Sequence, residues 1–248
     1  MPSKDLKIKS DAGELTACFA EPAEKGKYPA IILIHEVWGL DGHIRDVAER
    51  LAFEGYIVLA PDLFSGTGIL EQLGADIQKE MVDPATRDEA QKKMRAAMAP
   101  MNSRQFGADT VSKLEGCFRY LRGLDSCSGK IAVLGFCFGG TYAYALAVAE
   151  RGLSAAVPFY GHVPEPLDEL QKISCPVLAF YGEKDERLIG QVPEIKKVMA
   201  EAHKNFECHI YPEAGHAFFN DTNPQRYNKE AATESWEKSL AFLREYLA

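Results

Sequence analysis

Cys137 is the residue with the clearest chemical potential in this chain of 248 residues. It lies in Gly-Phe-Cys-Phe-Gly-Gly, between the apolar run 131–134 and a stretch rich in helix-forming alanine and leucine. Strand, tight turn and helix in this order form a nucleophile elbow when glycines flank a reactive side chain. A thiol at a helix N-terminus gains thiolate character from unpaired N–H groups and the helix dipole. The pattern equally fits a buried structural cysteine, so residues further along the chain must decide.

Two partners for such a nucleophile follow later segments that read as strands. Asp185 comes just after the apolar run 177–181, and His216 just after the predicted strand 206–211. Because reactive groups of a parallel sheet sit beyond the carboxyl ends of its strands, we expect both near Cys137. Each residue alone is weak evidence, but the order nucleophile, acid, histidine is that of the α/β-hydrolase triad. We therefore predict a triad in which the thiol attacks an acyl carbon, the imidazole transfers protons and the carboxylate fixes the imidazole tautomer.

The sequence His-Glu-Val-Trp-Gly at 35–39 follows the β-branched run 30–34. His-Glu opens the zinc-protease signature H-E-x-x-H, but Gly39 stands where the second ligand is needed, so no metal is expected. The alternative is a loop after an early strand that donates one backbone N–H to an oxyanion hole. We favour this second interpretation and expect the N–H groups of Val37 and Phe138 to hold the oxyanion.

Composition restricts the class of protein further. The net charge is −8, from 28 basic and 36 acidic residues, which argues against a nucleic-acid partner. The start of the chain has no apolar signal segment and no run is long enough to span a membrane, so a cytoplasmic protein without a membrane partner is expected. The six cysteines show no C-x-x-C spacing, so neither a zinc knuckle nor a disulfide framework is predicted. No cofactor is expected.

Alternation of apolar runs with amphipathic stretches predicts a single α/β domain over residues 1–248, with a mostly parallel sheet of about eight strands and helices on both faces. Residues 64–103 carry charged helical turns and form either a solvated helical excursion or a lid, and the charge favours the first. The expected strands are 6–10 and 15–20 as an edge hairpin, then 30–34, 56–60, 131–134, 155–160, 177–181 and 206–211; the expected helices include 41–54, 106–124, 191–202 and 224–247.

Several of these motifs together resemble the dienelactone hydrolase family, also called carboxymethylenebutenolidases, from about residue 10 to the C-terminus. The resemblance implies an eight-stranded α/β-hydrolase fold, no metal, and hydrolysis of an enol-lactone or related ester. The motifs that carry it are the Cys137 turn, His-Glu-Val-Trp-Gly-Leu at 35–40, Ala-Pro-Asp-Leu at 60–63, Asp185, and Gly-His-Ala-Phe at 215–218.

The resemblance also implies a role for Glu36. In the family the matching glutamate contacts the resting cysteine and moves when substrate binds; the alternative is a surface carboxylate at a strand end. Family members that degrade lactones hold the substrate carboxylate with arginines, one of them shortly after the catalytic histidine. This chain has Asn220 near that place, and this departure leaves the native lactone open. The residues expected to contact substrate are Trp38, Arg87, Arg95, Tyr160 and Phe218, with the two arginines as candidates for the second cation.

Other functions share the same motifs. A thioesterase or broad carboxylesterase uses the same triad and differs only in its pocket. A non-catalytic scaffold that binds a ligand or senses redox state through Cys137 is a different class of protein, but a pure binder has no need of all three triad groups. The expected partner is a small-molecule ester or lactone, and the expected assembly is a monomer or a small homo-oligomer.

Overall fold

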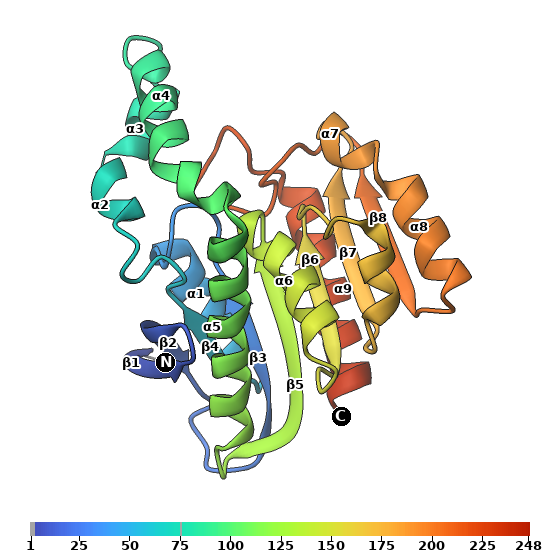
Figure 1. Ribbon diagram of the computed structural model, residues 1–248. Helices are drawn as coiled ribbons and strands as arrows, with labels where there is room; N and C mark the ends of the chain where they lie inside the picture. Colours follow the sequence, from blue (N-terminus) through green and yellow to red (C-terminus); the bar gives the residue numbers. More distant parts are fainter. Residues whose placement is uncertain (1–2, 75) are drawn as a thin grey trace.

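The computed structural model describes residues 3–74 and 76–248, which build one eight-stranded sheet in the order β1-β2-β4-β3-β5-β6-β7-β8 (Figure 1). β1 and β2 form an antiparallel hairpin, β2 is antiparallel to β4, and all later pairings are parallel. The predicted mostly parallel sheet is therefore confirmed. The strands are β1 (Lys4–Ser10), β2 (Gly13–Ala20), β3 (Tyr28–Ile34), β4 (Ile57–Pro61), β5 (Cys127–Phe136), β6 (Ala155–Phe159), β7 (Val177–Gly182) and β8 (Phe206–Tyr211).

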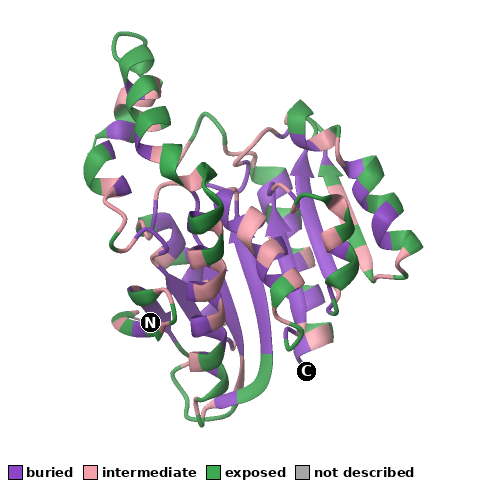
Figure 2. Cartoon of the chain, in the orientation of Figure 1, coloured by how far each residue is buried: buried purple, intermediate pink, exposed green. Residues whose placement is uncertain are grey.

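The central strands are buried on both faces, as Figure 2 shows. Residues 30–34 of β3 and every residue of β4, β6 and β7 are buried. Strands covered by helices on both sides need apolar residues at consecutive positions, which explains their continuous aliphatic and aromatic runs. This core fixes the carboxyl ends of β3, β5, β6, β7 and β8 along one edge of the sheet.

Helices cover both faces of the sheet (Figure 1). α1 (Gly42–Phe53) and α9 (Lys229–Leu247) lie on one face, while α5 (Arg104–Arg122), α6 (Phe138–Ala149) and α8 (Val192–Glu201) lie on the other. α9 begins at Lys229 rather than at residue 224, because the Asn228 side chain accepts a hydrogen bond from the Ala231 N–H at 3.1 Å and caps the first turn. Within the described ranges, no helix combines the length and apolar character needed to cross a membrane.

The chain between β4 and α5 forms a helical projection beyond the carboxyl ends of the strands (Figure 1). More than half of its residues are exposed (Figure 2), and several of these are charged. Its first two helices pack on the third, and its last turn packs on the third helix and on α5. The elements are α2 (Ile69–Leu73), α3 (Ile77–Val82), α4 (Arg87–Met98) and the 3₁₀ turn η1 (Ala99–Asn102); two further short elements, η2 (Leu167–Lys172) and α7 (Glu186–Ile189), lie after β6 and β7.

Candidate active site

Cys137 occupies a sharp turn between β5 and α6. Its backbone has φ 55° and ψ −111°, a region that costs a non-glycine residue about 1–3 kcal/mol. The surrounding hydrogen bonds hold this conformation: the Cys137 N–H donates to the Phe159 carbonyl at 3.0 Å, and the Cys137 carbonyl accepts from the Thr141 N–H at 3.0 Å. The turn thus projects the thiol from the sheet edge at the N-terminus of α6.

The glycines around Cys137 are required by close backbone contacts. A Cβ atom on Gly135 would lie 2.1 Å from the Gly139 carbonyl oxygen, and a Cβ on Gly139 would lie 2.2 Å from the Ile34 carbonyl oxygen. No side chain fits at either distance, so α6 can approach β5 and β3 this closely only through glycine.

His216 and Asp185 lie on the loops that follow β8 and β7. Their side chains pair through His216 Nδ1 and Asp185 Oδ2 at 2.6 Å. Burial works against a charged His216, but hydrogen bonds to Asp185 and Cys137, together with their charges, raise the histidine pKa to about 10. Burial likewise opposes the charged form of Asp185, yet the bond to His216 lowers its pKa overall. The arrangement therefore favours an imidazolium whose Nδ1–H is fixed on the carboxylate.

A cavity of about 380 Å³ connects these groups. It brings together five residues that the sequence singled out: Cys137, His216, Val37, Phe138 and Tyr160. Phe138 is the first residue of α6, and its N–H has no acceptor within the helix. The full lining consists of Val37, Met101, Asn102, Cys137, Phe138, Thr141, Tyr142, Tyr160, His162 and His216.

Glu36 precedes the cavity residue Val37, does not itself line the cavity, and is only 3% exposed. Burial is the main cause that raises its pKa to about 7, and a hydrogen bond from Asn220 Nδ2 to Glu36 Oε2, 2.6 Å long, acts in the opposite direction. The Tyr160 hydroxyl is close enough to lower the pKa of the same carboxylate slightly. No well-aligned hydrogen bond to this hydroxyl forms. Within the described residues, Glu36 is hydrogen-bonded to Asn220 and not to Cys137.

The remaining candidates for substrate contact lie outside the cavity lining. Phe218 is fully buried and packs against Tyr160, with ring centroids 5.3 Å apart, so it supports the wall from behind. Trp38 is partly buried in the loop after β3. Arg87 and Arg95 are on α4 in the helical projection, where Arg87 donates to the Val82 carbonyl at 3.4 Å.

His162 and Thr141 are cavity residues that the sequence analysis missed. The His162 N–H donates to Thr141 Oγ1 at 3.0 Å, which joins the loop after β6 to the first turn of α6. The signal was present, because His162 follows an apolar run at the same sheet edge as Asp185 and His216. Burial is the main cause that lowers the His162 pKa, which favours a neutral imidazole in the cavity wall.

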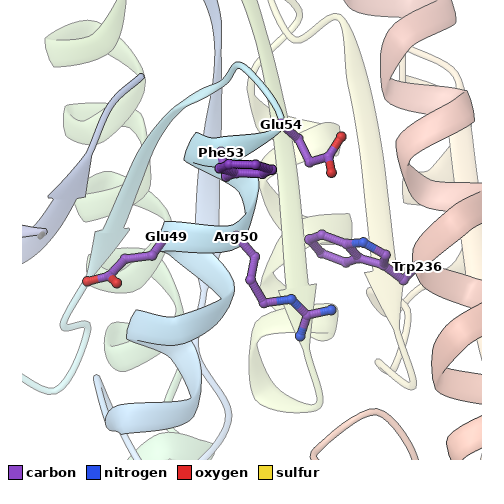
Figure 3. Close-up of a pocket in the computed structure, with 5 residues that line it drawn as sticks. All are labelled: Glu49, Arg50, Phe53, Glu54 and Trp236. Atoms are coloured by element: carbon purple, nitrogen blue, oxygen red, sulfur yellow. The ribbon is translucent and has the colours of Figure 1, made fainter. Parts of the chain in front are cut away.

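A second hollow of about 280 Å³ lies between α1 and α9 (Figure 3). Its lining comprises Glu49, Arg50, Phe53 and Glu54 of α1 and Trp236 of α9, and the Arg50 guanidinium stacks 4.3 Å from the centroid of the Trp236 indole. This lining contains no thiol, hydroxyl or imidazole, so it offers no nucleophile. In the described part of the chain, no cluster of three or more side chains has the geometry of a metal site.

The strand order, the antiparallel hairpin at one edge and the sharp turn between β5 and α6 define an α/β-hydrolase fold. Residues 15–247 match the model of the dienelactone hydrolase family, and the chain belongs to this family. A protein of Saccharolobus solfataricus that is named as a carboxymethylenebutenolidase is 35% identical to this chain. The match covers 97% of this chain and 98% of the relative. The crystal structure of a Klebsiella pneumoniae protein named as a dienelactone hydrolase superposes with a TM-score of 0.80 at 28% identity over 99% of both chains. The protein is accordingly a hydrolase that acts on esters or lactones.

Proposed function

We propose that this hydrolase cleaves an enol-lactone or a related carboxylic ester through Cys137, His216 and Asp185, with an acyl-thioester intermediate. The observation that carries the proposal is the convergence of a strained cysteine turn and a histidine–aspartate pair on one cavity. A cavity of about 380 Å³ suits a small-molecule substrate rather than a polymer.

In the first half of the reaction, the Cys137 thiol gives its proton to His216, the resulting thiolate attacks the acyl carbon, and the carbonyl π pair moves to oxygen. The N–H groups of Val37 and Phe138 stabilise this oxyanion. Collapse of the intermediate breaks the bond to the leaving oxygen, which takes a proton from His216. In a lactone this oxygen remains tethered to the acyl group.

In the second half, His216 accepts a proton from water as the water attacks the thioester carbon. Collapse then breaks the C–S bond and releases the carboxylic acid, and the departing thiolate takes the proton back from His216 to restore the thiol. Asp185 holds the imidazole in one tautomer throughout, because its Oδ2 accepts from Nδ1.

The test is turnover of a panel of lactones, p-nitrophenyl esters and acyl thioesters by the wild type and by Cys137→Ala. We expect the variant to lose at least about a hundredfold in kcat, because nothing replaces the nucleophile. Cys208→Ala is the matched control, since Cys208 is half-buried in β8 and does not line the cavity. Thermal unfolding of both variants would check that the fold survives.

The panel also separates the alternatives. A preference for thioesters would indicate a thioesterase, and turnover of many unrelated esters a broad carboxylesterase. Retention of more than a few per cent of the activity in Cys137→Ala would remove this residue as nucleophile. Turnover of no panel member by the wild type would favour a non-catalytic binding scaffold.

A further inference from the structure

His35 is a fully buried histidine that the acyl-transfer steps do not use. Its Nε2 accepts a hydrogen bond from the Leu63 backbone N–H at 3.0 Å. Because a backbone N–H can only donate, Nε2 is unprotonated and the ring proton must lie on Nδ1. Burial lowers the His35 pKa, which agrees with a neutral imidazole that keeps an acceptor nitrogen.

The protonated Nδ1 of His35 donates to the Glu36 carbonyl oxygen at 2.6 Å. The same oxygen also lies 3.3 Å from the Gly39 nitrogen, which donates to it. The peptide bond that follows Glu36 is trans and planar, so its carbonyl and its N–H point in opposite directions. The bond to His35 therefore turns the Val37 N–H away from the histidine.

The Val37 N–H is available for a ligand on that opposite side. Val37 lines the cavity beside Cys137 and Phe138. Its N–H donates no hydrogen bond to another residue within 3–74 and 76–248. The His35 ring also stacks on the Phe138 ring, with centroids 5.6 Å apart and an interplanar angle of 13°, so one side chain contacts Phe138 and the carbonyl of the peptide bond that carries the Val37 N–H.

We propose that His35 is a positioning residue that presets the oxyanion hole by fixing the peptide plane between Glu36 and Val37. Leu63 fixes the imidazole tautomer, and the imidazole fixes the carbonyl. Without this bond the peptide plane can rotate and turn the Glu36 carbonyl toward the cavity, where it would repel the developing oxyanion. The inference rests on the proposed function of Val37 and Phe138.

The test compares His35→Asn with His35→Gln, because these amides place their nitrogen and oxygen differently. An asparagine amide reaches the position of Nδ1 and can donate to the Glu36 carbonyl. A glutamine amide reaches the position of Nε2. It can accept the hydrogen bond from the Leu63 N–H but cannot donate to the Glu36 carbonyl. We expect His35→Gln to lower kcat on the order of a hundredfold and His35→Asn less than about tenfold, with KM changed less than about threefold in both.

A second measurement uses an aldehyde analogue of a hydrolysed ester as inhibitor. Addition of the Cys137 sulfur forms a C–S bond and moves the carbonyl π pair to oxygen, which then takes the His216 proton. The inhibition constant should rise at least about tenfold more in His35→Gln than in His35→Asn. The corresponding primary alcohol cannot form this adduct, and its inhibition constant should change less than about threefold.

Equal losses in the two variants would indicate a merely structural histidine, and an unchanged kcat in His35→Gln would show that the peptide plane needs no such bond. Either result overturns the inference. Alkylation of Cys137 by iodoacetamide, which replaces C–I by C–S without an oxyanion, should stay within about twofold of the wild type in both variants. If the wild type hydrolyses no ester, the proposed function fails first, and aldehyde binding still tests the role of His35.

Discussion

The Glu36 carboxylate is held by an amide whose orientation is fixed. Asn220 Oδ1 accepts hydrogen bonds from the Thr222 N–H at 3.1 Å and from the Thr222 hydroxyl at 2.6 Å. Since the Thr222 N–H can only donate, the amide oxygen must face Thr222 and the NH₂ group must face Glu36. A donor at that position favours the ionised carboxylate, whereas burial and the charge of Asp41 favour the protonated form.

Replacing Asn220 by Leu removes the donor and should raise the Glu36 pKa from about 7 by about one unit, the effect of one charge-assisted hydrogen bond. A ¹³C NMR titration of protein labelled at glutamate Cδ measures this, and the resonance is assigned by its absence in Glu36→Gln. Asn205→Leu is the matched control, because the Asn205 amide donates to Tyr246 Oη at 2.9 Å before β8 begins. An unchanged Glu36 titration in Asn220→Leu would contradict the assigned contact.

At the level of single residues, the sequence predicted which side chains lie at the sheet edge, but it did not predict which side chains form hydrogen bonds with one another. Cys137, Asp185 and His216 could be placed because each follows a predicted strand, and a parallel sheet gathers such positions at one edge. The contact between Asn220 and Glu36 joins residues 184 apart in the chain, and no local pattern encodes it. The sequence showed Asn220 only as a departure from the family, not as the partner of Glu36.

The turn between β5 and α6 depends on the glycines that let the helix approach the sheet. We expect Gly139→Ala to lower the free energy of unfolding by at least about 3 kcal/mol, because its Cβ would meet the rigid Ile34 carbonyl oxygen at 2.2 Å. Gly42→Ala is the matched control: Gly42 begins α1, and a Cβ there meets nothing within 4 Å. Urea unfolding measures both variants. A Gly139→Ala protein as stable as Gly42→Ala would show that the turn can relax.

The observed helices and strands agree with the predicted bounds where the sequence carries a clear turn or strand pattern. The hairpin around residues 11–12 forms as predicted, with Ser10 paired to Gly13. β4 and β8 lie within one residue of their expected bounds, and the chain continues with Asp62 after β4 and with Pro212 after β8. The three helices of the projection could not be separated from the charge pattern of residues 64–103, since their contacts are mainly with one another.

On the scale of the whole molecule, the sheet collects groups from distant parts of the chain into one cavity. β3, β5, β6 and β8 lead into Val37, Cys137, Tyr160 and the His216 loop, respectively. η1 adds Met101 and Asn102 from the end of the projection. Strand order alone predicted which residues lie at this edge of the sheet. It did not predict the whole cavity wall, because Met101 and Asn102 reach the cavity only where the helical projection returns to α5.

Concentrating buried ionisable groups at this edge links the stability of the molecule to pH. The Glu36 pKa is raised from an ordinary value of 4.5 to about 7 in the folded protein, mainly by burial. A raised carboxyl pKa means that the folded state binds its proton more tightly than the unfolded state does. The stability from this group is therefore fully present below pH 4.5 and is lost as the pH rises through about 7.

This linkage predicts the pH dependence of the free energy of unfolding. Between pH 5 and pH 8 the wild type should lose on the order of 2 kcal/mol more than Glu36→Gln, because glutamine has no proton to release. The stability from His216, whose pKa is raised from an ordinary 6.5 to about 10, is also lost as the pH rises through that range, but His216 is present in both proteins and its effect largely cancels in the comparison. Urea unfolding at pH 5, 6, 7 and 8 provides the measurement. Parallel curves for the two proteins would mean that Glu36 is already ionised in the folded state near its ordinary pKa, and that Asn220 offsets its burial.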